Sequence, residues 1–203
     1  MAGTGSEANR TVTAVPGIRV GHAEDAEART GCTVVLGPFR AAAEVRGLAS
    51  GTREMDTCAP LHIVEQVDAI VLTGGSAYGL AAADGVARWL EARGRGFPTP
   101  AARVAIVPAA VLYDLGVGRA DRRPDAAMGA AACEAASAGP VAEGSVGAGT
   151  GATVGKVRGV AHASPGGVGS WAERVGAYRV GAIAVVNAFG DVVDGSGRIL
   201  AGA

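Results

Sequence analysis

The chain has 203 residues, and its 18 Lys and Arg against 19 Asp and Glu exclude a strongly electrostatic partner such as nucleic acid or an anionic membrane. Hydrophobic residues make up 49 % and charged residues 18 %, which excludes a disordered chain, and no apolar run approaches the roughly 20 residues of a membrane-spanning helix. Because there are 33 glycines and only 4 % aromatic residues, we expect a folded domain with a core of small side chains.

The first ten residues lack the cationic and apolar regions of an export signal. We therefore interpret residues 1–10 as a flexible tail, residues 11–203 as part of a single domain, and the location as cytoplasmic.

Neither the cysteines nor the histidines show the spacing of a metal site. The cysteines are odd in number and widely separated, so we expect buried reduced thiols rather than disulfides at Cys32, Cys58 and Cys133. The histidines are interpreted as ordinary loop or core residues: His22, His62 and His162.

In the first third of the chain, the pattern predicts a strand over residues 11–20, interrupted at Pro16, and an acidic loop over 22–30. Apolar runs at 32–36 and 42–45 suggest a hairpin, with an irregular connection between them.

The next segment, residues 67–73, is apolar apart from Asp68 and Thr73 and stops at two glycines, which is typical of a buried strand. Ser76 then occupies the expected N-cap of a helix that ends near Gly94. Residues 104–115 are strand-like but broken by Pro108.

A second helix is predicted to begin at residues 123–125, with Pro124 in the first helical position, and to end before Gly139. Its alanines and glycines permit close packing. Residues 141–155 are almost only small residues and are interpreted as a loop. The apolar stretch 178–194 predicts one or two interior strands, so the alternation of elements favours an α/β or layered α+β domain.

Three polar residues stand out by their rarity or position. Lys156 is the one lysine in a chain rich in arginine, and its ammonium, unlike a guanidinium, can be desolvated and shift its pKa. Asn187 interrupts an apolar run, where its NH₂ group would suit an oxyanion. Tyr113 follows an apolar strand and can donate a phenol hydrogen bond. A surface lysine, a turn asparagine and a core tyrosine remain alternative interpretations.

Six blocks of sequence resemble, in the same order, the DmpA/NylC-type self-processing N-terminal-nucleophile hydrolases, a family of DmpA aminopeptidases, β-peptidyl aminopeptidases and nylon-oligomer hydrolases. The blocks are GIRVGH from Gly17, GTRE from Gly51, GGSAYGLAAADGV from Gly74, VPAAVLYDL from Val107, GAGTGATVGK from Gly147 and AVVNAFGDVVD from Ala184.

The resemblance implies a four-layer αββα sandwich and a precursor that cuts itself into α and β fragments. It implies that this chain is the α fragment, with the Ser or Thr nucleophile at the start of a C-terminal β fragment beyond Ala203. Tyr113, Lys156 and Asn187 match active-site positions of the family. It also implies a small peptide or amide substrate, homo-oligomers of αβ pairs, and no metal or organic cofactor.

Two alternatives stay open at this point. In the first, the strand ending at Gly74 and the helix from Ser76 form a small-molecule or anion site in an α/β binding domain. In the second, the chain is a non-catalytic member of the same family. The residues do not decide between α-peptide, β-peptide and nylon-type amide substrates.

Overall fold

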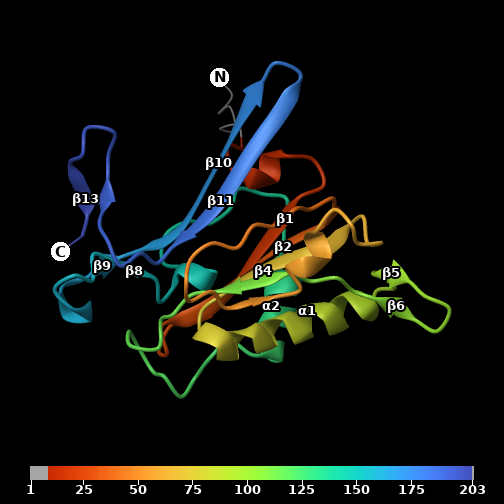
Figure 1. Ribbon diagram of the computed structural model, residues 1–203, viewed down its shortest axis with the longest axis horizontal. Helices are drawn as coiled ribbons and strands as arrows, with labels where there is room; N and C mark the ends of the chain where they lie inside the picture. The colour runs from red at the N-terminus through yellow and green to blue at the C-terminus, as the bar shows by residue number, and fades with distance from the viewer. Residues whose placement is uncertain (1–8, 203) are drawn as a thin grey trace, which may run out of the picture.

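A five-stranded sheet organises the computed structural model, which describes residues 9–202 (Figure 1). Its strand order is β1-β2-β4-β7-β3. β7 runs parallel to β4, and the other neighbours are antiparallel. The strands are β1 Arg19–Asp25, β2 Thr30–Phe39, β3 Thr52–Arg53, β4 Val67–Thr73 and β7 Ala109–Val111. The predicted buried strand 67–73 is therefore confirmed.

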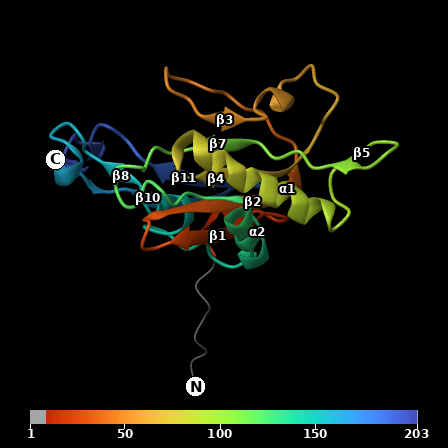
Figure 2. The ribbon, with the colours of Figure 1, turned by 90° about the horizontal axis from the view of Figure 1, so that it is seen from below.

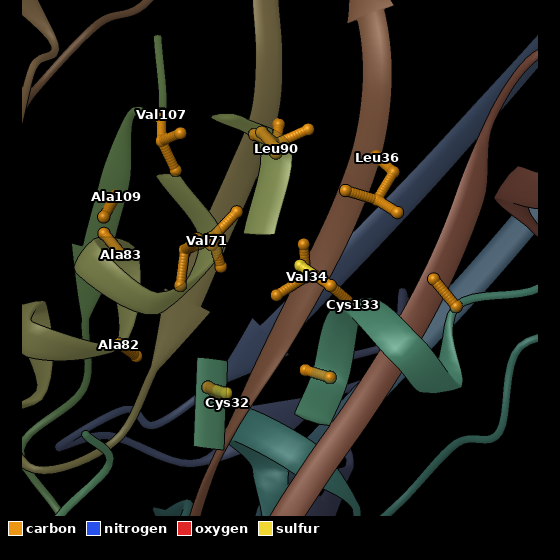
Figure 3. Packing of buried hydrophobic residues seen from close by; sticks show 14 residues of the cluster. Cys32, Val34, Leu36, Val71, Ala82, Ala83, Leu90, Val107, Ala109 and Cys133 are labelled. Carbon is orange, nitrogen blue, oxygen red and sulfur yellow. The ribbon is translucent and has the colours of Figure 1, made fainter. Parts of the chain in front are cut away.

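Alternating side chains of β2 separate the two faces of this sheet. Val34 and Leu36 belong to the main core, in which they pack with small residues of the helices (Figure 3). Val35, between them, lies on the opposite face in a second cluster that includes Ile183. One face of the sheet is therefore covered by helices and the other by a later part of the chain.

Two helices cover the first face, α1 Ala82–Glu91 and α2 Ala126–Ala135, as Figure 2 shows with both in front of the strands. They approach each other through two glycines. A Cβ atom at Gly85 would lie 1.8 Å from the Ala126 carbonyl oxygen, and one at Gly129 would lie 2.0 Å from that of Ala82. The predicted close packing of small residues is thus realised between the two helices.

The opposite face carries a long hairpin of β10 (Gly167–Val175) and β11 (Tyr178–Val186), joined in antiparallel register. Helices, sheet and hairpin give successive α, β and β layers, which confirms a mixed α/β fold with layered sheets. The expectation that residues 178–194 are interior is wrong for this chain, because Tyr178 and Val180 are exposed. Among the strands of residues 9–202, β11 pairs only with β10, so its second edge has no neighbour there.

Short elements complete the described part of the chain. The remaining strands are β5 Phe97–Pro98, β6 Arg103–Val104, β8 Thr153–Val154, β9 Ser164–Pro165, β12 Val192–Val193 and β13 Ile199–Ala201. The 3-10 turns are η1 Val12–Ala14, η2 Asp56–Cys58, η3 Ser76–Ala81, η4 Gly147–Gly149 and η5 Val160–His162.

The first strand begins later than the sequence predicts. Residues 12–14 form η1, and Gly17 adopts φ +88° immediately after Pro16, so that the chain turns before β1 begins at Arg19. β1 then runs to Asp25, well into the segment predicted as a loop. Residues 1–8 of the predicted tail lie outside the described residues, and the backbone of Arg10 accepts a hydrogen bond from Ala172 N at 2.6 Å.

The predicted hairpin of 32–36 with 42–45 is also wrong. β2 extends from Thr30 to Phe39, and both of its edges are occupied, one by β1 and the other by β4. Residues 42–45 consequently have no edge to pair with and are exposed without strand structure. The predicted strand 104–115 is reduced to β6 and β7, with the break at Pro108 as expected.

Both helices begin differently from the prediction. Ser76 is not an N-cap: its φ is +55°, its N–H donates to the Leu112 carbonyl, and η3 precedes α1. In α2 the N-cap is Asp125, whose carboxylate accepts a hydrogen bond from Met128 N at 2.9 Å, so Pro124 precedes the cap instead of opening the helix.

The three cysteines are free and buried, as predicted. Burial raises the pKa of the Cys32 and Cys133 thiols to about 12, so both are protonated at neutral pH. Of the helices within residues 9–202, none is long and apolar enough to cross a membrane.

Candidate active site

The strand register brings several loops to one end of the sheet. β4 and β7 are parallel, so their carboxyl ends meet at Thr73 and Val111, while antiparallel β2 begins at the same end. Tyr113 and Asp114 follow β7 after Leu112. In Figure 1, β8 and β9 lie toward the side of the molecule where the C-terminus is found. Polar loop residues are thus gathered where the parallel strands end.

The glycine-rich segment 141–155 is anchored across this end of the sheet. The N–H of Gly147 donates to Glu24 Oε2 at 2.9 Å, and that of Ala148 donates to Thr33 Oγ1 at 3.0 Å. A side chain at Gly147 would collide with His22, because a Cβ there would lie 2.5 Å from Nδ1, and its φ is +49°. The segment is therefore an ordered loop, as predicted, and it delivers Lys156 to a defined place.

The segment after β8 is fastened to the segment after β11. Gly155 N donates to the Gly190 carbonyl at 2.8 Å, and Lys156 N donates to the Phe189 carbonyl at 2.7 Å. These two backbone bonds set Lys156 beside Asn187, although the two residues are 31 positions apart.

Lys156 and Asn187, two of the predicted site residues, are in direct contact. Lys156 Nζ donates to Asn187 Oδ1 at 2.9 Å, to the Thr153 carbonyl at 2.6 Å and to the Ala188 carbonyl at 3.0 Å. An ammonium has three hydrogens, so these three oxygens use all of them. Lys156 is therefore partly buried, and its ammonium links the segment after β8 to the segment after β11.

The hydrogen bonds of Asn187 define which way its amide points. Oδ1 accepts from two donors, Lys156 Nζ at 2.9 Å and Thr153 N at 3.0 Å, and Nδ2 donates to the Tyr113 carbonyl at 3.0 Å. If the amide were reversed, Nδ2 would face two other donors, Lys156 Nζ and Thr153 N, so only the present orientation satisfies the hydrogen bonds. Among residues 9–202, no second acceptor lies within hydrogen-bonding distance of Nδ2, which leaves one N–H on the exposed side.

Tyr113, the third predicted residue, joins this cluster through its backbone. Its carbonyl accepts the Asn187 bond, whereas 65 % of its surface is exposed. The phenol thus extends outward from the cluster and is accessible to a bound molecule.

Partial burial of the ammonium lowers the pKa of Lys156 from its ordinary value. The three oxygens around Nζ are neutral carbonyl and amide groups, and they offset the lost hydration through hydrogen bonds. The cluster consequently holds a positive charge beside the amide of Asn187.

Asp114 is a buried residue that sequence reasoning missed. Its Oδ1 accepts from Gly75 N and its Oδ2 accepts from Thr30 Oγ1, each at 2.7 Å. A Cβ at Gly74 would lie 2.0 Å from Oδ2, so the double glycine makes room for this carboxylate. A carboxylate three residues after the end of an apolar strand, together with the glycine pair after the neighbouring strand, is the signal that would have found it.

This carboxylate also weakens the anion-binding alternative. The N–H of Gly75 is taken by Asp114, and that of Ser76 is taken by the Leu112 carbonyl. The turn at Gly75 and Ser76, which would have bound an external anion, therefore already binds the side chain of Asp114. Its donors are not free for a phosphate.

No cluster of three or more His, Cys, Asp or Glu side chains suited to a metal occurs within the described part of the chain. His22 is partly buried, and its Nδ1 lies 2.9 Å from Thr33 Oγ1. Desolvation lowers the pKa of His22, while the charge of Glu24 acts against that shift.

Comparisons with known proteins agree on a family. Residues 10–199 match the model of peptidase family S58. An uncharacterised aminopeptidase of Mycobacterium tuberculosis is 47 % identical over 195 residues, covering 91 % of this chain and 54 % of the relative. A 6-aminohexanoate-oligomer endohydrolase of Kocuria sp. is 35 % identical over 192 residues, covering 92 % and 50 %. The chain thus spans about half the length of the curated relatives that it matches.

Solved structures show the same architecture. A β-aminopeptidase of Burkholderia sp. superposes with a TM-score of 0.69 at 25 % identity, covering 92 % of this chain and 54 % of that one. An L-aminopeptidase D-Ala-esterase/amidase from Ochrobactrum anthropi, described as a variant of the Ntn-hydrolase fold, superposes with a TM-score of 0.64 at 18 % identity, covering 92 % and 56 %. The fold is therefore of the Ntn-hydrolase type, and by sequence the chain belongs to peptidase family S58.

Proposed function

We propose that this chain is the α part of an amide or peptide hydrolase that matures by self-cleavage. A C-terminal β fragment, not contained in residues 1–203, would carry a Ser or Thr nucleophile at its new N-terminus. Membership of family S58 and the aminopeptidase and endohydrolase relatives support this assignment. The expected fourth layer of the αββα sandwich would come from the same β fragment.

The orientation of the Asn187 amide is the observation that carries the proposal. Two donors hold Oδ1 and the Tyr113 carbonyl accepts one N–H of Nδ2, so the other N–H has no partner among residues 9–202. A rigid donor of this kind stabilises the negative oxygen that forms when an amide carbonyl is attacked. We assign Asn187 to the oxyanion hole.

Lys156 has two roles in the proposal: it orients the Asn187 amide, and it supplies a positive charge. Its three hydrogens are engaged by oxygens, so it is placed to orient Asn187 and not to accept a proton. Its positive charge would also help to keep a nearby α-amine neutral by repulsion. That amine can then serve as the base for its own hydroxyl.

The reaction follows from these roles. The hydroxyl oxygen attacks the amide carbon while its proton passes to the α-amine, and the carbonyl oxygen becomes an oxyanion beside Asn187. The proton is then delivered to the leaving amine as the C–N bond breaks, and water hydrolyses the resulting ester by the same route. The exposed phenol of Tyr113 is available to orient the substrate or the attacking group.

The proposal extends to the assembled protein. We infer homo-oligomers of αβ pairs acting in the cytoplasm on small peptides or amides, without metal or organic cofactor. Light scattering of the purified protein tests the assembly.

The decisive experiment is expression of the whole gene product, of which residues 1–203 are a part. We expect two fragments on a denaturing gel, with Ser or Thr as the first residue of the smaller one, and hydrolysis of aminoacyl amides. A single uncleaved chain without hydrolysis would favour the non-catalytic alternative.

A further inference from the structure

A cavity of about 500 Å³ adjoins the Lys156–Asn187 cluster. Its walls come from three segments: the β1–β2 turn at Arg29, the loop after β7 at Val117, and the stretch between β8 and β9. Thr153 connects it with the cluster, because Thr153 lines the cavity while its N–H donates to Asn187 Oδ1 and its carbonyl accepts from Lys156 Nζ. A molecule in this cavity would therefore lie next to the amide that we assign to the oxyanion hole.

The cavity wall has one charged side chain, and its surface is about equally polar and apolar. Val117, Val160, Ala163 and Pro165 contribute aliphatic surface, and Arg29 is the charged side chain among the described residues of the lining. Both the volume and this composition suit a small organic molecule with one ionic group.

The Arg29 guanidinium has no carboxylate within 4.0 Å among residues 9–202, in contrast to its neighbours. Arg119 is paired with Glu27 at 2.9 Å and Asp121 at 2.8 Å, and Arg122 also takes Glu27, at 2.8 Å. The nearby acids are thus already engaged by other arginines. Arg29 keeps an uncompensated positive charge at the cavity.

The turn itself does not require an arginine at this position. Arg29 has φ +52°, a left-handed conformation that glycine or asparagine adopts at lower cost. The turn is held by other groups, since Ala28 N donates to Asp25 Oδ1 at 2.9 Å and Arg119 N donates to the Ala28 carbonyl at 3.1 Å. The local fold therefore gives no reason for the cationic side chain.

Thr153, which lines the cavity, also carries a buried polar atom without a partner. Its hydroxyl oxygen is one of two buried side-chain polar atoms that lack a hydrogen-bond partner among the described residues. Buried polar atoms are nearly always paired, so this hydroxyl is an exception in the residue that joins the cavity to the Lys156–Asn187 cluster.

We propose that this cavity binds the leaving-group half of the substrate and that Arg29 pairs with a carboxylate on that half. The proposal rests on the proposed hydrolase function. Charge determines which half of the substrate enters the cavity. Arg29 and Lys156 would both repel the ammonium of an aminoacyl group, whereas they would attract a carboxylate. The favoured substrates are therefore amides whose leaving amine carries a carboxylate beyond a short apolar spacer.

The test uses the full gene product and a matched pair of substrates, alanyl-4-aminobenzoate and its neutral analogue alanyl-4-aminobenzamide. Arg29→Asn removes the charge and suits the left-handed turn, while Arg29→Lys keeps the charge. Arg40→Asn is the matched control. The two arginines flank the ten-residue strand β2: Arg29 precedes its first residue and Arg40 follows its last. Arg40→Asn therefore removes an arginine charge at the opposite end of the strand.

We expect Arg29→Asn to raise KM for the aminobenzoate by about 10-fold or more, because a charge-assisted pair is lost, and to leave the aminobenzamide unchanged. Arg29→Lys should retain part of the preference, and Arg40→Asn all of it. Equal effects on both substrates, or none on either, would overturn the proposal.

Binding separates this proposal from the hydrolase assignment. Calorimetry should show that wild type binds 4-aminobenzoate more tightly than 4-aminobenzamide and that Arg29→Asn abolishes the difference. If neither substrate is cleaved but this difference holds, the hydrolase assignment fails while the carboxylate site stands. If cleavage occurs without any difference, only the carboxylate site fails.

Discussion

Lys156 and Asn187 form a charged donor–acceptor pair in which the ammonium holds the amide oxygen at 2.9 Å, while the amide nitrogen donates to the Tyr113 carbonyl at 3.0 Å. Thr153 N–H strengthens this orientation by donating to the same oxygen at 3.0 Å. The pair links a glycine-rich loop to the end of a hairpin strand. The position of the Asn187 amide therefore depends on Lys156 as well as on Asn187 itself. Substitution of either residue should change the activity that we assign to this amide.

Asn187→Asp separates the two roles of the Asn187 amide. A carboxylate still accepts from Lys156 and Thr153, but its second oxygen replaces both N–H groups of Nδ2, the unpaired one and the one that donates to the Tyr113 carbonyl. We expect kcat of the processed enzyme to fall by about 10²-fold or more, as for loss of an oxyanion-hole donor.

Asn187→Ala is the comparison. It should lower kcat similarly and also leave Thr153 N unpaired, at a cost of about 1 to 3 kcal/mol in stability. Because the same donor can serve self-cleavage, rates are normalised to processed enzyme. A processed Asn187→Asp enzyme with wild-type kcat would contradict the oxyanion role.

Lys156→Arg should impair hydrolysis although the charge is kept. The three acceptors surround a single nitrogen at 2.6 to 3.0 Å, and a planar guanidinium presents its hydrogens from three nitrogens at a greater reach. We expect a clear loss of kcat and a lower melting temperature.

Lys156→Met serves as the uncharged control of similar length. If geometry is the requirement, both variants should be impaired. Normal turnover by processed Lys156→Arg would show that the lysine has no positioning role.

The rarity of Lys156 and Asn187 singled out both residues in the sequence, and the structure brings them into contact, while their catalytic roles stay predictions. Their other partners are backbone groups, such as the carbonyls of Tyr113 and Ala188, which have no sequence signature. The apolar run located β4 correctly, because a strand buried on both faces is mostly apolar; Asp68 is the one charged residue in it. The apolar pattern missed β10, whose side chains alternate irregularly between glycine, charged and apolar residues.

Gly85→Ala tests the close approach of the helices. The added methyl would lie 1.8 Å from the Ala126 carbonyl oxygen, so the helices must separate. Overpacking of this kind costs about 1 to 3 kcal/mol, to be measured by denaturant unfolding. Gly116→Ala is the control, because a Cβ there meets nothing within 4 Å among the described residues. Equal stability of the two variants would show that the helix contact is not a constraint.

Because His22 is partly buried, we expect the free energy of unfolding to decrease on acidification. Burial lowers its pKa below the ordinary 6.5, despite the opposing charge of Glu24. Between the lowered value and 6.5 the unfolded chain binds the proton and the folded one does not, so the free energy of unfolding decreases as the pH falls through this window.

His22→Asn removes the titrating group and can still bond Thr33 Oγ1. Denaturant unfolding at several pH values between 7 and 5 should give a shallower slope for this variant than for wild type. Identical slopes would assign the acid sensitivity to other groups.

The hairpin strand β11 predicts how residues 1–203 behave when expressed alone. Tyr178 is 77 % and Val180 59 % exposed, and the strand has a hydrogen-bonded neighbour only in β10. An open edge with apolar side chains pairs readily with other chains. We expect the isolated chain to aggregate and to melt without a cooperative transition, whereas the full gene product does neither.

Substituting lysine for the exposed residues Tyr178 and Val180 tests whether the open strand β11 causes the aggregation. Tyr178→Lys and Val180→Lys place charge on the open strand without touching the Lys156–Asn187 cluster, and charged edges oppose pairing between chains. In the isolated chain the double variant should reduce aggregation in light scattering. In the full gene product it should weaken the association that covers this face. A monodisperse, cooperatively melting wild-type chain of residues 1–203 would show that the exposed face of β11 needs no cover.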